Sequence, residues 1–196
     1  AYHLFATRIT DPAGCVTTAE YDYRVLQPKR IIDPNQNSQE ADYDAFGRVW
    51  ATSFYGTELG EAVGFPPLNR AGHYWASAGE VALQPEYALG RQASALYYDG
   101  NTALGQVHIP LATAALVADR YPEDLDRQIR VSMASIDGFG RTLQTRQKVE
   151  DGNAYSVDEW GNLELVDGKP KIVHASPRWR VSERVEYNNK GLAVRV

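Results

Sequence analysis

The sequence carries one short phrase twice, as "YDAFGR" at residues Tyr43–Arg48 and as "IDGFGR" at residues Ile136–Arg141. Each copy has an aspartate, two variable positions, a glycine and an arginine. An aspartate side chain can accept a hydrogen bond from the backbone two residues further on, and a glycine can adopt the positive φ that reverses the chain. The phrase therefore predicts a tight corner that joins two β-strands.

Looser copies of the phrase lie in "RITDPAGCVTTAEYD", "KRIIDPNQNSQEADYD", "YSVDEWGNLELVDG" and "RVEYNNKGLAVRV". In each copy, turn-forming residues stand between segments rich in β-branched and aromatic residues, a pattern typical of strand, turn and strand. Corners that recur this often in one chain predict a mainly β fold, an antiparallel strip of hairpins with one short helix. We expect the residues with an architectural role at these corners to be Asp11, Gly14, Asp33, Asn35, Tyr43, Asp44, Gly47, Arg48, Asp137, Gly140, Arg141, Trp160, Gly161, Tyr187 and Gly191.

Composition and length set broad bounds on the protein. A chain of 196 residues is best accounted for by one domain, so we expect a single segment over residues 1–196 with an irregular insertion at about residues 57–126. The net charge of -5, with scattered basic residues, argues against a nucleic-acid or anionic-membrane surface. No apolar run is long enough to span a membrane. The single cysteine, Cys15, excludes an internal disulfide and is expected to be buried or half-buried.

Two segments of the insertion have their own predictions. "ASALYYDGN" is expected to be a strand that enters a turn at Asp99, Gly100 and Asn101. "PLATAALVADRYPEDLD", at residues 110–126, is expected to be the helix, because Pro110 suits a first helical turn and Pro122 would end it. The alternating ending "GLAVRV" is expected to be a strand without its return partner, which suggests a piece of a longer chain.

Signals for metal, cofactor or catalytic chemistry are weak. The four histidines do not have metal-ligand spacing, and no phosphate-binding or dinucleotide-binding glycine motif is present, so no metal and no cofactor are expected. Glu123, Asp124 and Asp126 are charged neighbours typical of a solvated helix end. Asp11 and Asp33, each followed by proline, could in principle form an acid–base pair, although turn chemistry accounts for both.

The phrases resemble the YD repeats of the Rhs superfamily. More narrowly, "DGFGRTLQTRQKVEDG" followed by "PRWRVSERVEYNNKGLAVRV", with "IDPNQN" and "ASALYYD" upstream, resembles the late region of the B component of bacterial Tc insecticidal toxin complexes and their SpvB-like relatives. The resemblance is specific over residues 9–52 and 135–196. In that family a double aspartate-proline motif belongs to a self-cleaving protease, but the second copy here reads "DPNQ" and lacks the closing glycine.

The resemblance implies a structural function. It implies that the strands form part of a hollow shell which, with the C component, encloses a cytotoxic effector before the A component translocates it. The protein would then be secreted, would not insert directly into a membrane, would not bind nucleic acid and would not be an enzyme. Two alternatives stay open at this point: self-cleavage by Asp11 and Asp33, or a carbohydrate- or protein-binding module that uses exposed aromatic residues. The candidate aromatic residues are Tyr74, Trp75, Tyr97, Tyr98 and Trp179.

Overall fold

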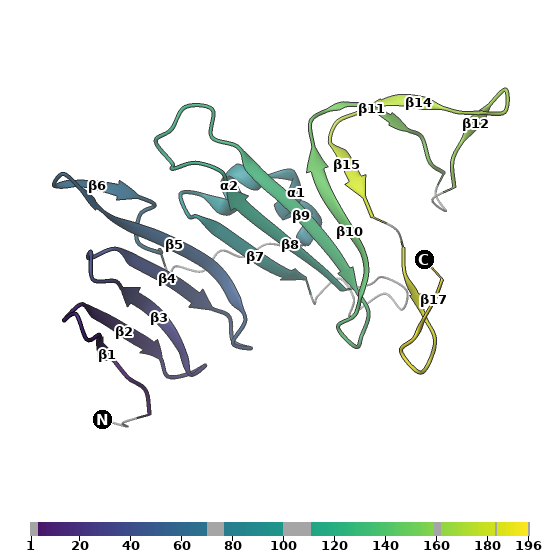
Figure 1. Cartoon of the computed structure of the whole chain (residues 1–196). Coiled ribbons are helices and arrows are strands. Elements are labelled where there is room, and N and C mark those ends of the chain that lie inside the picture. The colour runs from purple at the N-terminus through teal and green to yellow at the C-terminus, as the bar shows by residue number, and fades with distance from the viewer. Residues whose placement is uncertain (1–3, 70–76, 100–110, 159–161, 183, 196) are drawn as a thin grey trace.

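The protein is described by a computed structural model that covers residues 4–69, 77–99, 111–158, 162–182 and 184–195. Its main feature is one antiparallel sheet, which confirms the predicted fold class. In the described part of the chain this sheet has eleven strands, in the order β1-β2-β3-β4-β5-β7-β8-β9-β10-β15, with β6 paired to β5 (Figure 1). β1 pairs there only with β2, and β15 only with β10, so the sheet is open at both ends.

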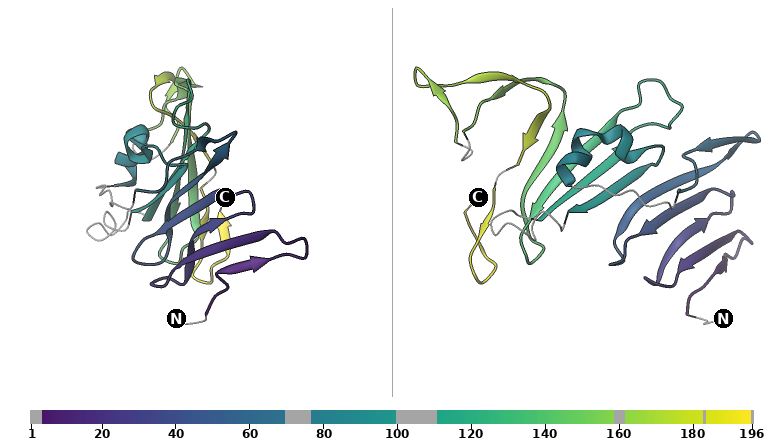
Figure 2. Two further views of the ribbon diagram at one scale, coloured as in Figure 1. Left: turned by 90° about the vertical axis from the view of Figure 1, so that its left-hand side faces the viewer. Right: turned by 180° about the vertical axis from the view of Figure 1, so that it is seen from behind.

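The first half of the sheet is a simple meander. Its strands are β1 (Arg8–Thr10), β2 (Val16–Asp22), β3 (Gln27–Ile32), β4 (Ser38–Tyr43), β5 (Val49–Glu58) and β6 (Glu61–Gly64). Most residues of β2 and β3 are half-buried, because strands β1 to β3 form a single layer that no helix covers (Figure 2). The predicted corners join β1 to β2, β3 to β4 and β4 to β5.

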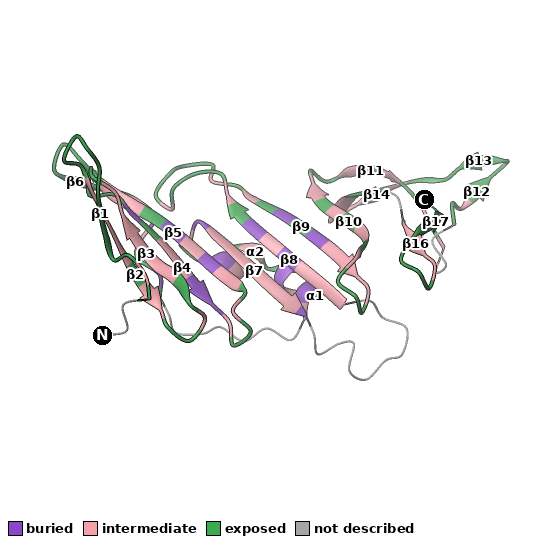
Figure 3. Ribbon diagram, turned by 60° about the horizontal axis from the view of Figure 1, so that its bottom comes forward, coloured by how far each residue is buried: buried purple, intermediate pink, exposed green. Residues whose placement is uncertain are grey.

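The second half of the sheet contains β7 (Ser94–Asp99), β8 (Leu111–Ala118), β9 (Ile129–Ile136), β10 (Thr142–Val149) and β15 (Arg178–Val181). Two short helices, α1 (Ala78–Leu83) and α2 (Pro85–Leu89), lie on one face of β7, β8 and β9 (Figure 2). The hydrophobic core lies between these helices and the strands that they cover. It contains Ala78, Val81, Ala82, Leu89, Ala114, Leu116, Val131 and Met133, and Figure 3 shows the buried residues concentrated there and on β4 and β5.

The helix predicted within residues 110–126 is wrong. Residues Leu111–Ala118 form β8, which pairs with β7 on one side and β9 on the other. Ala114 and Leu116 face the helices and are buried, whereas Val117 is 45% exposed, which is the alternation of a strand. Pairing with two neighbouring strands thus overrides the helix propensity of this alanine-rich segment.

The stretch expected to be irregular contains β6, α1, α2, β7 and β8. The predicted strand in "ASALYYDGN" is confirmed as β7, whereas Gly100 and Asn101 lie outside the described residues. Cys15 is exposed, contrary to expectation, because it directly follows the corner at Gly14 rather than facing a core.

Within the described residues, three small two-stranded sheets follow β10 in addition to the main sheet. β11 (Gly152–Tyr155) pairs with β14 (Ile172–Ala175), and β12 (Leu165–Val166) pairs with β13 (Lys169–Pro170), forming an arm that projects beyond β10 and β15 (Figure 1). β16 (Glu186–Tyr187) and β17 (Ala193–Arg195) form the last hairpin. The segment "GLAVRV" therefore contributes a strand, as predicted. The expectation that this strand lacks a return partner is wrong, because β17 pairs with β16.

Candidate functional site

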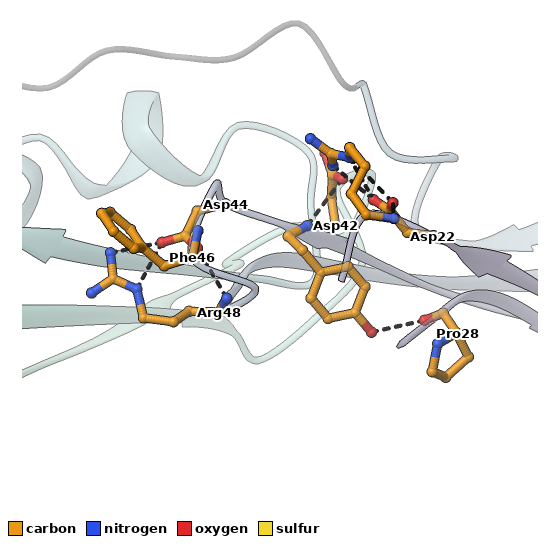
Figure 4. Close-up of polar contacts among 8 residues, drawn as sticks. Asp22, Pro28, Asp42, Asp44, Phe46 and Arg48 are labelled. Carbon is orange, nitrogen blue, oxygen red and sulfur yellow. Dashed lines mark hydrogen bonds and ion pairs between the residues drawn. The ribbon is translucent and has the colours of Figure 1, made fainter. Parts of the chain in front are cut away.

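The corner at Asp44 shows how the repeated phrase folds (Figure 4). The Asp44 N–H donates to the Arg48 carbonyl at 2.9 Å, and the Gly47 N–H donates to the Asp44 carbonyl at 3.1 Å. The Asp44 carboxylate oxygen Oδ1 accepts the N–H groups of Phe46 and Arg48, each at 2.9 Å. Gly47 has φ +78°, so the corner is a three-residue hairpin loop that needs a positive φ before the second strand.

Five further corners share this arrangement, at 11–15, 33–37, 137–141, 158–162 and 188–192. In each, the first residue's N–H donates to the carbonyl of the fifth residue at 2.9–3.0 Å. The fifth residue's N–H donates to the first residue's side chain at 2.8–3.0 Å. One side-chain oxygen thus satisfies backbone donors that the loop leaves without a strand partner.

Glycine is not obligatory at the fourth position of these corners. Gly14, Gly140 and Gly191 have φ of +87°, +78° and +79°, but Gln36 holds φ +68° in the corner that begins at Asp33. The sequence "DPNQ" therefore forms the same corner without the closing glycine. Asn37, the fifth residue, adds a side-chain bond from its Nδ2 to the other Asp33 carboxylate oxygen at 3.0 Å.

Two corners carry an Asp–Arg ion pair in addition to the backbone bonds. Arg48 donates through Nε to Asp44 Oδ2 at 2.7 Å, and Arg141 donates through Nε to Asp137 Oδ2 at 2.7 Å. In each pair Nη2 approaches the same oxygen, at 2.7 and 2.6 Å. Each arginine also lies near the ring of the phenylalanine in its own loop, which for Arg48 is Phe46, with 5.1 Å from guanidinium carbon to ring centre.

The ion pair sets the protonation of Asp44. Partial burial raises the pKa of this carboxyl, but hydrogen bonds from Arg48 and Phe46 and the charge of Arg48 outweigh that effect, so the pKa is lowered overall. Asp137 has the same balance: desolvation raises its pKa, and the bonds and charge of Arg141 together lower it. Both side chains are therefore carboxylates at neutral pH.

A tyrosine from a distant strand closes each of these two corners. The Tyr98 ring lies 4.0 Å from the Arg48 guanidinium carbon, and its hydroxyl donates to the Val49 carbonyl at 3.1 Å. Tyr187 repeats the arrangement, at 4.4 Å from Arg141 and with a 3.2 Å bond to the Thr142 carbonyl. We call this pair of contacts, a ring on the corner arginine and a hydroxyl on the next carbonyl, a tyrosine clasp.

Part of the clasp recurs at a third place. The Tyr43 hydroxyl donates to the Pro28 carbonyl at 2.8 Å, just after the turn that begins at Asp22 (Figure 4). Tyr43, Tyr98 and Tyr187 each stand directly before an Asp or Asn. These tyrosines and the corners that they contact lie at one end of the strands, the lower end in Figure 1. The corners at Asp11 and Asp33 lie at the opposite end of the strands.

The remaining candidates are placed as follows. Asp11 bonds the Cys15 N–H at 2.8 Å, and both Asp33 oxygens bond Asn37, which lowers the Asp33 pKa. Trp160 and Gly161 lie outside the described residues.

The aromatic residues proposed for a binding platform lie in different places. Tyr74 and Trp75 lie outside the described residues, Tyr97 and Trp179 pack against the core, and Tyr98 forms a clasp. The three candidates within the described residues therefore do not form one exposed platform. Sequence reasoning named Tyr98 only as a binding candidate, although its place before Asp99 repeats the position of Tyr43 before Asp44.

The described residues offer little for other chemistry. Within the described ranges, no group of three or more His, Cys, Asp or Glu side chains could hold a metal ion. No helix of the described chain has the length and apolar character needed to cross a membrane.

Comparisons with known proteins find similarity only among solved structures, and the matches described here are to Tc-toxin structures. No family model matches the chain, and no curated protein sequence matches it significantly. A crystal structure of TcdB2-TccC3-Cdc42 matches with a TM-score of 0.71 and 25% identity, over 94% of this chain and 11% of that chain. The chain has a Tc-toxin, Rhs-related fold. A Photorhabdus luminescens Tc holotoxin pore with a TccC3 mutation matches with a TM-score of 0.72 and 24% identity, over 96% of this chain and 11% of that chain.

A crystal structure of TcdB2-TccC3-TEV matches with a TM-score of 0.67 and 25% identity, over 95% of this chain and 11% of that chain. The chain thus spans about a tenth of the length of each of these Tc-toxin chains, and nearly all of it takes part in the match.

Proposed function

We propose that this chain is a wall segment of an Rhs-type toxin shell, which encapsulates a cytotoxic effector within a secreted Tc-like toxin complex. The observation that carries the proposal is the match of nearly the whole chain, whose main feature is one open sheet, to part of the TcdB2-TccC3 structures. We propose that the segment corresponds to the late part of the B component, which its sequence resembles. Its partners are then the C component and, through other parts of a full chain, the A component.

The geometry suits a wall better than a compact domain. A wall needs one continuous layer, extended by a repeated unit of constant geometry, with both ends available to further strands. The repeated corners supply that unit, because each reverses the chain with a loop of three residues and the same backbone hydrogen bonds. These corners begin at Asp11, Asp33, Asp44 and Asp137. The described sheet has end strands that pair on one side only, so further strands can extend it.

We further propose that the segment has no catalytic turnover and binds no cofactor, nucleic acid or membrane interior. The self-cleavage alternative needs two aspartates that share one site. Here the Asp11 carboxylate accepts the Cys15 N–H, and both Asp33 oxygens accept hydrogen bonds from Asn37, so each carboxylate is engaged within its own corner. Incubation of the purified chain followed by intact-mass spectrometry should show one unchanged mass, and cleavage near Asp11 or Asp33 would reverse this conclusion.

The enclosing role is tested by protease protection. A full-length chain containing this segment would be co-produced with a C-type partner that carries its effector, and the complex treated with a nonspecific protease. We expect the effector to stay intact in the complex and to be digested once the complex is denatured. A double Gly47→Val, Gly140→Val variant should lose protection, because valine is strained at a positive φ. Digestion of the effector at equal rates inside and outside the unaltered complex would contradict the proposal.

A further inference from the structure

The sheet separates between β5 and β7. β5 pairs with β4 from Val49 to Tyr55, and β7 pairs with β8 along its whole length. Between β5 and β7, however, only Ala51 with Ala95 and Thr52 with Ser94 are paired. The two strands therefore diverge toward the corner at Asp44, and the helices α1 and α2 cover one face of the sheet beside the opening.

A cavity of about 300 Å³ occupies this divergence. Three aromatic side chains, Trp50, Tyr97 and Tyr98, contribute to its lining together with aliphatic residues such as Val81 and Leu116. Asp44 and Arg48 provide its charged groups. The Arg48 side chain is 44% exposed, so the cavity has its mouth at this corner.

Size and charge define what the cavity could hold. An apolar protein cavity of about 150 Å³ accommodates benzene, so twice that volume accommodates a two-ring aromatic group. Arg48 is neutralised by Asp44 at 2.7 Å and stacked on Tyr98 at 4.0 Å, and Asp44 already accepts bonds from Phe46 and Arg48. An ionic ligand would have to compete with this pair, whereas a neutral ring only displaces water from apolar walls.

We propose that this cavity is a binding site for a neutral two-ring aromatic group of the size of indole. The group could be a free small molecule or the side chain of a tryptophan in a polypeptide, since both present the same ring. The site does not depend on the proposed wall function, because its described lining residues belong to β5, β7, β8, the two helices and the Asp44 corner.

The test is a titration of the 196-residue chain with indole, followed by methyl NMR. Val81, Leu96 and Leu116 line the cavity and carry methyl groups, whereas Leu165 and Leu192 lie on the outlying hairpin arm and the last corner. We expect saturable shifts in the first group and none in the second. A parallel titration with N-acetyl-tryptophanamide, and one with a short tryptophan-containing peptide, separates the sources. If indole alone binds, the site takes a free molecule, and if the peptide binds as well, it takes a polypeptide side chain.

A cavity-filling variant provides the matched control. Ala88→Leu places a larger side chain in the cavity wall and should weaken indole binding at least about tenfold, because it occupies volume that the ring needs. Ala62→Leu makes the same change at an exposed position on β6 and should leave binding unchanged. Absence of saturable shifts in the unaltered chain, or full binding by a folded Ala88→Leu variant, would overturn the proposal. If Ala88→Leu does not fold, the methyl pattern of the unaltered chain decides alone.

Discussion

Two glycines in one corner allow the turn assignment to be tested with a matched control from the same loop. Gly138 and Gly140 belong to the same loop of "IDGFGR", and a methyl group added at either would meet no atom within 4 Å. They differ in backbone conformation: Gly140 has φ +78°, and Gly138 is not among the glycines with positive φ. Alanine at these two positions therefore separates backbone strain from steric clash.

The expected magnitudes follow from that difference. At Gly140 an alanine side chain must adopt the left-handed region, which costs about 1–2 kcal/mol. At Gly138 it is accommodated without strain, and it reduces the freedom of the unfolded chain, which is neutral or stabilises by up to about 1 kcal/mol. With a urea dependence of about 2 kcal/mol per M, Gly140→Ala should lower the unfolding midpoint by about 0.5–1 M.

The assay is urea unfolding monitored by tryptophan fluorescence and circular dichroism, with both variants beside the unaltered chain. Equal urea midpoints for Gly138→Ala and Gly140→Ala would refute the reasoning that the positive φ favours glycine at residue 140. A loss at Gly140 together with no loss at Gly138 would support it.

Three further outcomes are expected. Tyr98→Phe removes the hydroxyl that donates to the Val49 carbonyl and should lower the free energy of unfolding by about 0.5–1.5 kcal/mol; no loss in urea unfolding would mean that the hydroxyl contact of the clasp is not stabilising. Leu116→Ala should cost about 2–5 kcal/mol because Leu116 is buried, whereas Val117→Ala should cost much less; similar losses would contradict the strand assignment of this segment. The folded-state pKa of Asp44 lies below its unfolded value, so its contribution to the free energy of unfolding is present above about pH 4 and is lost as pH falls through the folded pKa. An Asp44→Asn variant should therefore show a shallower loss of stability with falling pH in acid titrations followed by circular dichroism.

The corners could be predicted from the sequence because their chemistry is local. An Asp or Asn, a loop of three residues and a residue with positive φ make every bond of the corner within five positions. The strand class of the fold follows, since each corner needs a strand on both sides. The corner at Asp33 shows the limit of this reasoning, because Gln36 adopts the positive φ that the sequence pattern reserves for glycine.

The middle of the chain was harder to predict because its outcome depends on distant partners. Nothing within "ATAALVA" distinguishes a helix from a strand, and the pairing of β8 with β7 and β9 decides it. The two helices are six and five residues long, too short for a periodic signal. One local signal does exist: Ser77 and Glu80 have capping-box spacing, and the Ser77 hydroxyl accepts the Glu80 N–H at 3.1 Å.

The clasp explains why tyrosine and arginine occur in the same phrase, which no single corner explains. A corner needs only a side-chain oxygen at its first position, as Asn188 demonstrates, and its own backbone bonds do not use the preceding tyrosine. Tyr43 contacts the carbonyl of Pro28, after the preceding turn at the same end of the strands, while Arg48 of the same phrase receives Tyr98 from 50 positions later in the sequence.

One phrase thus contributes a tyrosine to the turn before it and presents an arginine to the tyrosine after it. Between β5 and β7, where the strand pairing is short, the contact of Tyr98 with Arg48 joins β7 to the Asp44 corner. The exchange therefore adds contacts at the ends of the strands where the backbone ladder is interrupted. A sheet built in this way can be lengthened by adding phrases like YDAFGR, which carries both the tyrosine and the arginine. The copy IDGFGR has Ile136 at the tyrosine position and supplies only the arginine. The same argument predicts that the strands separate less readily at the end that carries the clasps than at the opposite end, which carries the Asp11 and Asp33 corners.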